Sequence, residues 1–283
     1  MNEINCPAPA KLNLFLHIIG RRPDGYHLLE TVFRFVDYGD VVHLRLRDDE
    51  RIVRTHPLAG VAEEEDLCVR AARLLQQAAA VPIGVEISLD KRLPMGGGLG
   101  GGSSDAASVL LGLNRLWQLN WSRQRLQALA LQLGADVPVF VFGQSAFAQG
   151  IGEELQAVAL RPAWYLVLIP PVHVSTPKIF AHQQLTRDSK SIRITDFSEA
   201  EQLLSLTRND LQAVACLEYP VVAEYLAWLN QYAPARMTGS GACVFAEFAD
   251  ESQAQKIFAL LPGNMRGFVA RGMDRHPLYD LAK

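Results

Sequence analysis

The sequence has few of the features that mark several large classes of protein. Its 283 residues include only four cysteines, Cys6, Cys68, Cys216 and Cys243, which lie far apart and share no C-x-x-C or Cys–His spacing. The spacing therefore predicts neither a zinc site nor a disulfide framework. We expect small thiol side chains in a reducing compartment, the cytoplasm.

Long apolar runs and an excess of one charge are also missing. The longest apolar run, "WYLVLIPPV", is too short to span a bilayer, and "MNEINCPAPAK" lacks the apolar core of a signal peptide. Lys and Arg number 27 against 30 Asp and Glu, so the formal net charge is only -3. Nothing favours nucleic acid or a membrane as a partner, and small-molecule chemistry is expected instead.

Glycine, by contrast, is concentrated in "LPMGGGLGGGSSDAA", residues 93–107. Each glycine weakens a regular element by roughly 0.5–1 kcal/mol relative to alanine, so such a cluster indicates that the backbone itself has a function. Free N–H groups and the positive end of a following helix suit an anion such as phosphate. Ser103, Ser104 and Asp105 are predicted caps of that helix, and a flexible linker is the alternative interpretation.

Three familiar phosphate loops do not fit this stretch. No Gly-Lys-Ser or Gly-Lys-Thr occurs, which excludes the Walker A loop. Gly96, Gly98 and Gly101 satisfy G-x-G-x-x-G, but no acidic residue near 118–121 could bind a ribose, so the dinucleotide interpretation is weak. "DYG" at residues 37–39 precedes the loop, contrary to the order of protein-kinase motifs.

The alternation and capping patterns predict an α+β fold in two lobes, with domains at 1–160 and 161–283. Strands are predicted at 11–18, 31–47, 85–89, 235–248 with an internal loop, and 267–273. Helices are predicted from Asp66, from Ser103, over 122–133, from Thr176-Pro177, near 198–207, 209–217 and 221–232, and over 251–261.

Two charged residues are candidates for chemistry. Strand alternation places Lys11 and Asn13 on the same face, opposite the leucines of "KLNLFLHI". Most lysines in such a position simply face water. Asp136 follows Gly134 in a short turn, where the residue pattern alone favours a helix cap over a catalytic base.

Five stretches together resemble one superfamily of kinases. "PAPAKLNLFL", "RPDGYH", "LPMGGGLGGGSSDAA", "LGADVPVF" and "TGSGACVF" occur in the order found in the galactokinase, homoserine kinase, mevalonate kinase and phosphomevalonate kinase superfamily. Within it, "DGYH" with "GADVPVF" resembles the family of 4-diphosphocytidyl-2-C-methyl-D-erythritol kinases. The motifs extend from Pro7 to Phe245, nearly the whole chain.

The resemblance implies a two-lobed kinase with the active site in the cleft between the lobes. ATP would be the co-substrate with Mg²⁺, and the γ-phosphoryl group would pass to the 2-hydroxyl of 4-diphosphocytidyl-2-C-methyl-D-erythritol in the non-mevalonate route to isoprenoids. Asp136 would be the base, and Lys11 would stabilise charge beside it.

The resemblance also assigns binding residues. The phosphates would lie on Pro94, Met95, Gly96, Gly97, Gly98, Leu99, Gly100, Gly101, Gly102, Ser103 and Ser104, with Lys91 and Leu67 near adenine. Many members have Asn where this chain has Asp66. Either Ser103 or Ser104 could ligate Mg²⁺.

For the acceptor, the resemblance implies contacts from Asn13 and a cytosine site at Tyr26 and His27, with Phe180 and Thr176 adding an aromatic and a polar contact. Packing of Tyr26 in the turn, a Thr176 cap and a core role for Phe180 are the structural alternatives. The spacing of "TGSGACVF" favours a tight hairpin, whereas the resemblance favours a role in closing the site.

Two further functions stay open from the sequence. One is a sister kinase acting on mevalonate, homoserine or a sugar, and the other is a non-catalytic ligand sensor on the same fold. The presence of both Lys11 and Asp136 argues against the sensor. Only small-molecule partners are expected, with the chain as a monomer or a weak homodimer.

Overall fold

The computed structural model describes residues 2–58, 60–192 and 206–283. In chain order the elements are β1 (Glu3–Arg21), β2 (His27–Leu46), β3 (Ile52–Arg54), α1 (Leu67–Ala79), β4 (Val85–Asp90), α2 (Gly101–Leu116), α3 (Arg123–Ala130), α4 (Val137–Phe142), β5 (Ala146–Gln149), β6 (Glu154–Ala157), β7 (Trp164–Leu168), α5 (Thr176–Ala181), α7 (Gln212–Glu218), α8 (Pro220–Leu229), β8 (Ala235–Met237), β9 (Val244–Phe248), α9 (Glu251–Phe258), β10 (Gly267–Met273) and the short 3-10 helix η2 (Tyr279–Leu281). The fold is α+β, as the sequence predicts.

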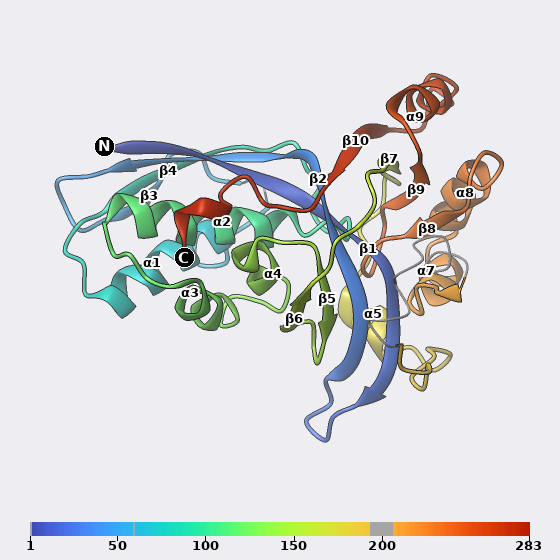
Figure 1. The fold of residues 1–283 in the computed structure, drawn as a ribbon, viewed down its shortest axis with the longest axis horizontal. Coiled ribbons are helices and arrows are strands. Elements are labelled where there is room, and N and C mark those ends of the chain that lie inside the picture. The colour runs from blue at the N-terminus through green and yellow to red at the C-terminus, as the bar shows by residue number, and fades with distance from the viewer. Residues whose placement is uncertain (1, 59, 193–205) are drawn as a thin grey trace.

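Two long strands, β1 and β2, connect the parts of the molecule. They pair antiparallel, and their hairpin extends away from α1 to α4 and past α5 (Figure 1). The strand order continues as β3-β4-β2-β10-β7-β9-β8, with β5 also on β2 and β6 on β5. The β1–β2 register shifts between Pro9 and Lys11 and again between Asn13 and Leu16. Such bulges re-aim side chains, and here they flank Lys11 and Asn13.

The helices lie in two groups on either side of these strands. Figure 1 shows α1 to α4 beside β3 and β4 at one end of the molecule, and α7, α8 and α9 beside β8, β9 and β10 at the other. A first apolar cluster contains buried side chains of α1 to α4, and a second contains those of α7 and α8. Leu16 and Ile18 belong to the second cluster, whereas Leu278 and Ala282 belong to the first. The division of the chain near residue 160 stays a prediction.

Most predicted elements are confirmed, with ends shifted by a few residues. Asp66 caps α1 and accepts from the N–H groups of Cys68 and Val69. Ser122 caps α3 in the same way, and this helix ends at Ala130. "ARMTGSGACVFAEF" forms β8, a loop and β9, as predicted. The helix predicted near 198–207 falls outside the described residues.

The predicted start of α2 is wrong. The helix begins at Gly101, and its N-cap is Gly100, which has a left-handed φ of 71° and no side chain to donate or accept. Ser103, Ser104 and Asp105 therefore lie inside the helix and do not cap it. A serine or aspartate cap needs extended backbone geometry, and glycine adopts the left-handed conformation that this loop requires instead.

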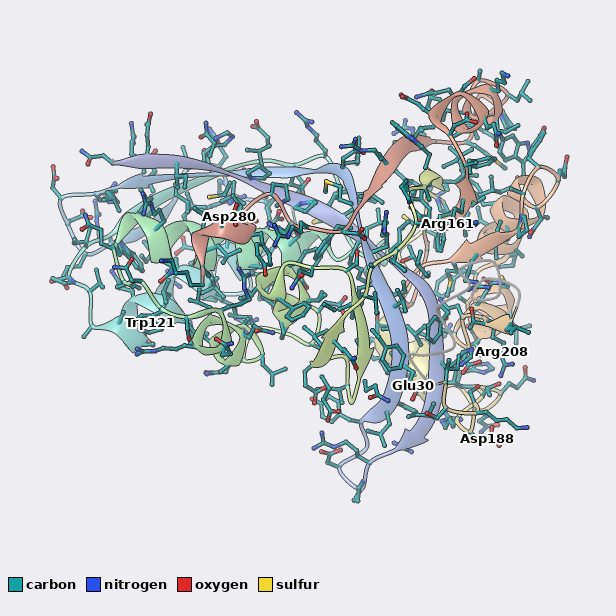
Figure 2. The ribbon with its side chains drawn as sticks, viewed as in Figure 1. Glu30, Trp121, Arg161, Asp188, Arg208 and Asp280 are labelled. Carbon is teal, nitrogen blue, oxygen red and sulfur yellow. The ribbon has the colours of Figure 1, made fainter. Side chains whose placement is uncertain are left out.

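Buried Glu30 of β2 ties the segment before residue 193 to the hairpin. Its carboxylate accepts from Ser191 Oγ at 2.5 Å, from the Ile192 N–H at 2.8 Å and from Gln149 Nε2 at 3.0 Å. Figure 2 shows Glu30 on the hairpin, with Asp188 and Arg208 on the neighbouring coil. The segment around residue 188 is thus held against the long strands.

Candidate active site

Two neighbouring cavities open where the glycine loop meets the long hairpin. The first, called here the loop cavity, has a volume of about 510 Å³ and is lined by residues 94–103 together with Leu67 and Lys91. The second, called here the hairpin cavity, has a volume of about 810 Å³ and is lined by Lys11, Asn13 and the hairpin end. Five residues line both: Ser103, Asp136, Thr176, Pro177 and Ser240. A reaction between a ligand in each cavity would occur beside these residues.

The glycine loop is shaped by left-handed backbone and by close packing. Gly96, Gly98 and Gly100 have φ values of 67°, 77° and 71°, a region that side chains disfavour. A Cβ atom at Gly98 would lie 2.2 Å from the carbonyl oxygen of Thr238. The turn of "TGSGACVF" therefore packs directly against the loop, and one residue of each segment, Ser240 and Ser103, lines both cavities.

Helix α2 begins immediately after this loop. The first N–H groups of an α-helix have no partner within the helix, and its dipole favours negative charge at that end. The loop cavity therefore suits a chain of phosphates.

Only one of the two serines of the loop lines a cavity. Ser104 is fully buried, and its Oγ donates to the carbonyl oxygen of Pro9 at 2.7 Å. Ser103 is half-buried and lines both cavities. The structure thus favours Ser103 as the hydroxyl available to a ligand or to a metal ion bound with it. Across the described residues, no three or more His, Cys, Asp or Glu side chains are grouped so as to hold a metal.

Lys11 and Asp136 meet at the junction, although 125 positions separate them. Lys11 is 2% exposed, and its Nζ lies 3.4 Å from Asp136 Oδ2. The ammonium also donates to Asn13 Oδ1 and, at 3.1 Å, to the carbonyl oxygen of Gly98. The strand alternation correctly places Lys11 and Asn13 on one face.

Asp136 does not act as a helix cap, which is the alternative that its position suggests. It precedes α4, but its side chain makes no capping hydrogen bond. The side chain is 40% exposed in the wall of both cavities, facing Lys11. A carboxylate with this placement is free to accept a proton from a bound ligand.

Asn13 is oriented by contacts that the sequence does not reveal. Its Nδ2 donates to Thr31 Oγ1 at 2.9 Å, so its Oδ1 must face Lys11. Its backbone N–H donates to Thr238 Oγ1 at 2.9 Å. These contacts join β1 to β2 and to the turn before β9.

The hairpin end gathers the predicted aromatic residues. The rings of His27 and Phe180 lie 5.0 Å apart between centroids, with 32° between their planes. Tyr26 is 61% exposed beside them, so it is not packed into the turn. Phe180 also contacts the second apolar cluster, which means that its site and core interpretations are compatible.

Thr176 lines both cavities, and its Oγ1 lies 2.6 Å from Ser240 Oγ. The capping alternative for Thr176 is wrong, because Ser175 occupies the N-cap position of α5.

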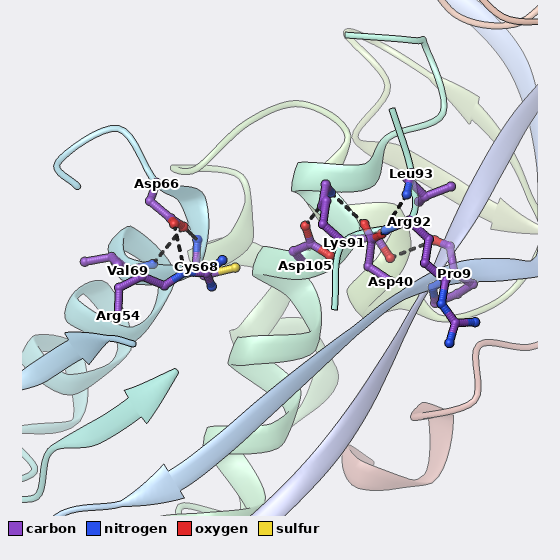
Figure 3. Close-up of polar contacts among 11 residues, drawn as sticks. Pro9, Asp40, Arg54, Asp66, Cys68, Val69, Lys91, Arg92, Leu93 and Asp105 are labelled. Atoms are coloured by element: carbon purple, nitrogen blue, oxygen red, sulfur yellow. Dashed lines mark hydrogen bonds and ion pairs between the residues drawn. The ribbon is translucent and has the colours of Figure 1, made fainter. Parts of the chain in front are cut away.

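Lys91 is paired with two buried carboxylates, as Figure 3 shows. Its Nζ lies 2.6 Å from Asp40 Oδ2 and 2.8 Å from Asp105 Oδ2. Burial raises the pKa of Asp105 to about 7, against the lowering effect of Lys91 and with the help of Asp40. The ammonium is thus held in the wall of the loop cavity.

Leu67 opens α1 beside the same cavity. The preceding Asp66 is turned toward the helix N–H groups and Arg54, whose Nε lies 3.5 Å from its Oδ2 (Figure 3). The Asp66 carboxylate is therefore stabilised by a buried arginine as well as by the helix N–H groups.

Some residues of the site could not be found from the sequence. Asp40 and Thr31 act through partners elsewhere in the chain, and no local pattern marks them. Thr238 opens "TGSGACVF", but that motif does not reveal its hydrogen bond with Asn13. Asp105 lies in the glycine motif, but its pairing with Lys91 depends on the true start of α2.

Family models and curated proteins that match this chain agree on the kind of enzyme that it resembles. The GHMP kinases N terminal domain matches residues 66–144, and the GHMP kinases C terminal domain matches residues 188–266. The 4-diphosphocytidyl-2-C-methyl-D-erythritol kinase of Thiobacillus denitrificans is 63% identical over 97% of both chains. The enzyme of the same name from Nitrosospira multiformis is 60% identical over 99% of this chain and 95% of its own length.

Solved structures agree with these relatives. A crystal structure of 4-(cytidine 5'-diphospho)-2C-methyl-D-erythritol kinase superposes with a TM-score of 0.80 at 33% identity, covering 95% of this chain and 99% of the other. Homoserine kinase from Cytophaga hutchinsonii superposes with a TM-score of 0.70 at 18% identity, over 98% and 96% of the chains. At that identity the second likeness shows the fold alone.

Proposed function

This chain belongs to the family of 4-diphosphocytidyl-2-C-methyl-D-erythritol kinases, and we propose that it transfers the γ-phosphoryl group of ATP to the 2-hydroxyl of 4-diphosphocytidyl-2-C-methyl-D-erythritol. The observation that carries the proposal is the meeting of Lys11 and Asp136 at the junction of the two cavities. The product would serve the non-mevalonate route to isoprenoid precursors.

ATP would occupy the loop cavity. Its phosphates would lie on residues 94–104, with their backbone N–H groups and the start of α2 facing the negative oxygens. Leu67, at the start of α1, and Lys91 also line this cavity, which supports the assignment of the adenine beside them. The γ-phosphate would then reach the junction beside Ser103.

The cytidine end of the acceptor would occupy the hairpin cavity. Tyr26 and Phe180 offer ring faces to the base, and His27 offers a ring nitrogen to its edge. Asn13 and Thr176 line the way from this end to Asp136. The methylerythritol hydroxyl would thus face the γ-phosphate.

The chemical step requires the protein to position the two substrates and to stabilise negative charge. Asp136 would take the hydroxyl proton as the oxygen bonds to the γ-phosphorus, while the bond from that phosphorus to the β–γ bridging oxygen breaks and ADP leaves. Lys11, fixed by Asn13 and Gly98, would stabilise the negative charge on the moving group. No covalent enzyme intermediate is needed.

The Ser103 hydroxyl is an oxygen donor of the kind that Mg²⁺ prefers, and it lines the cavity assigned to the phosphates. Mg²⁺, when bound there, would neutralise negative charge on the phosphates, and phosphate oxygens and water would supply its other ligands.

A coupled ADP-release assay over a panel of alcohols tests the proposal. We expect ADP with 4-diphosphocytidyl-2-C-methyl-D-erythritol and none with mevalonate, homoserine or galactose. ADP with mevalonate alone would indicate a sister kinase, and binding without any ADP would indicate a ligand sensor.

The position of transfer can be read from the product. Carbon 2 of the acceptor bears a methyl group and no hydrogen, so a 2-phosphate has no hydrogen on the carbon next to its ester oxygen. The new ³¹P signal should therefore be a singlet in the proton-coupled spectrum, and a split signal would mean transfer to another hydroxyl.

The remaining predictions concern the location of the protein, its partners and its oligomeric state. Among the described residues, no helix is long and apolar enough to cross a membrane. The cytoplasmic location, the limitation to small-molecule partners and the monomeric or weakly dimeric state stay predictions.

A further inference from the structure

Arg187 lies behind the aromatic residues of the hairpin cavity, where no sequence motif marks it. Its Nε lies 3.2 Å from His27 Nε2 and donates to it. The rest of the guanidinium donates to backbone carbonyls: Nη1 to Leu185 at 3.0 Å, and Nη2 to Phe180 at 3.1 Å and to His182 at 2.9 Å. One side chain thus joins His27 of the hairpin to the Phe180 segment.

The arginine sits on a segment that is itself anchored. Two residues further on, the Ser189 N–H donates to the carbonyl oxygen of Ile18 at 3.0 Å, and Ser189 Oγ donates to Asp210 Oδ2 at 2.7 Å. Ser191 and Ile192 bind the Glu30 carboxylate. The residues that follow Arg187 are therefore hydrogen-bonded to both β1 and β2.

This contact determines which nitrogen of His27 carries the proton. A guanidinium has only donors, so the His27 Nε2 that receives its N–H must be unprotonated. The proton of the neutral ring is then on Nδ1. Burial, together with the positive charges of Arg187 and Arg21, lowers the pKa of His27, which keeps the ring neutral.

We propose that Arg187 is a positioning residue that locks His27 in its Nδ1–H form and thereby sets the preference of the hairpin cavity for a cytosine edge over a uracil edge. The inference rests on the proposed function, because it assumes that the base binds beside His27. Arg187 acts through His27 and does not have to touch the ligand.

The preference follows from the chemistry of the two bases. Position 3 of cytosine is an unprotonated nitrogen that accepts a hydrogen bond, whereas position 3 of uracil is an N–H donor. A ring locked as an Nδ1–H donor can pair with the first and is opposed by the second. A histidine free to change tautomer could pair with either, because its ring nitrogens exchange the roles of donor and acceptor.

The tautomer can be measured without any ligand. In the full chain labelled with ¹⁵N-histidine, the long-range ¹H–¹⁵N spectrum distinguishes a protonated ring nitrogen from an unprotonated one, and the His27→Gln variant identifies the His27 signals. We expect Nδ1–H for the wild type at neutral pH. An Nε2–H ring or a charged ring in the wild type would overturn the proposal, whether or not any variant folds.

The base preference is tested by calorimetry with cytidine diphosphate and uridine diphosphate. We expect the wild type to favour cytidine diphosphate, and Arg187→Gln to reduce that ratio about tenfold. In turnover, the KM for the cytidine acceptor should rise about tenfold, while kcat changes by less than about threefold. An unchanged ratio in Arg187→Gln would contradict the role assigned to the arginine.

The matched control is Arg271→Gln, which removes the same charge from an arginine that is 62% exposed and lies 3.8 Å from Asp37. It should leave the ratio and the His27 spectrum unchanged. If the wild type binds neither diphosphate, the proposed function fails, and the spectrum still decides the tautomer.

Discussion

The loop cavity and the hairpin cavity share one wall but are built from different chemistry. The first uses glycine backbone in left-handed conformations and the start of a helix, and the second uses side chains from the hairpin and from α5. Phosphate oxygens are equivalent acceptors, so N–H groups suffice to bind them. A pyrimidine base differs from its relatives in which atoms of its edge donate and which accept, so it must be read by groups whose protons are fixed. The loop cavity therefore provides binding strength, and the hairpin cavity provides selectivity.

Asp136 belongs to both cavities, so its substitution should give the largest effect. Asp136→Ala should lower kcat by about 1,000-fold, because general-base catalysis contributes on the order of 10²–10⁴. Its thermal midpoint should change little, since the side chain makes no capping hydrogen bond. ADP release and thermal unfolding measure the two quantities.

The matched control is Asp250→Ala at the start of α9. The Asp250 carboxylate does cap its helix and accepts from the Gln253 N–H at 2.9 Å. This variant should lose about 1 kcal/mol of stability and keep its activity. Loss of stability without loss of activity in Asp136→Ala would mean that Asp136 is structural after all.

A methyl group on the loop should damage the loop cavity alone. Gly98→Ala should lower kcat/KM for ATP at least 100-fold, because the new Cβ would meet the Thr238 carbonyl at 2.2 Å and force the loop to move. Affinity for cytidine diphosphate, measured by calorimetry, should fall far less.

The Gly60→Ala variant separates the effect of backbone strain from the effect of a steric clash of the new Cβ atom. Gly60 has the same φ of 77°, but a Cβ there would meet nothing within 4 Å. The left-handed backbone alone should cost roughly 1–2 kcal/mol of stability, with KM for ATP nearly unchanged. Equal activity losses in both variants would indicate that backbone strain, and not the packing of the loop on the turn, is the cause.

Removal of an aromatic face should affect the hairpin cavity alone. Tyr26→Leu should raise KM for the cytidine acceptor about tenfold, since stacking on a base is worth roughly 1–3 kcal/mol. KM for ATP and the thermal midpoint should not move, because the ring is 61% exposed. Tyr232→Leu, at a 40% exposed tyrosine that lines neither cavity, is the control. A rise in KM for ATP would mean that the two cavities are not independent.

The titration of His276, which lines neither cavity, should change the stability of the fold without changing the KM for either substrate. Burial, with help from Arg123, lowers the pKa of His276 to about 3 from 6.5. Below pH 6.5 the unfolded chain therefore binds a proton that the folded chain refuses, and stability is lost as the pH falls toward 3. The contribution of His276 to this loss should be about 2 kcal/mol at pH 5, measured by urea unfolding as the difference between the wild type and His276→Asn, because Asp105, with its raised pKa, acts in the opposite direction.

His276→Asn should remove the part of the pH dependence that comes from His276, since an amide does not titrate, so the variant should lose less stability than the wild type as the pH falls from 7 to 5. His56→Asn, at an exposed histidine, should retain it. If the wild type and His276→Asn lose stability in parallel between pH 7 and 5, another group is responsible.

Much of the fold follows from local patterns, and the site follows only in part. Alternation identifies β1, and the capping residues Asp66 and Ser122 mark the starts of two helices. The predicted start of α2 is wrong because the preference of serine and aspartate for the N-cap position competes there with the left-handed backbone of the glycines. That backbone depends on the packing of the loop against Thr238, which the local sequence does not show. Prediction from local sequence patterns fails where contact with a distant segment determines the backbone conformation.

The distances at the site could not be predicted from spacing. Lys11 and Asp136, Lys91 and Asp40, and His27 and Arg187 are pairs separated by 125, 51 and 160 positions. The resemblance to a kinase family supplies the first pair as partners, but not the second or the third. Those pairs depend on strand register and on how β2 crosses the molecule.

The return of the chain to its starting lobe also has a consequence for its synthesis. Leu278 and Ala282 are buried in the first apolar cluster, and Arg123 donates to the carbonyl oxygens of Tyr279 and Ala282 at 2.5 and 2.7 Å. A ribosome makes these residues only after all of α5 to β10. The lobe that begins first is therefore completed last, and the emerging chain must keep part of its apolar surface uncovered while the second half is translated.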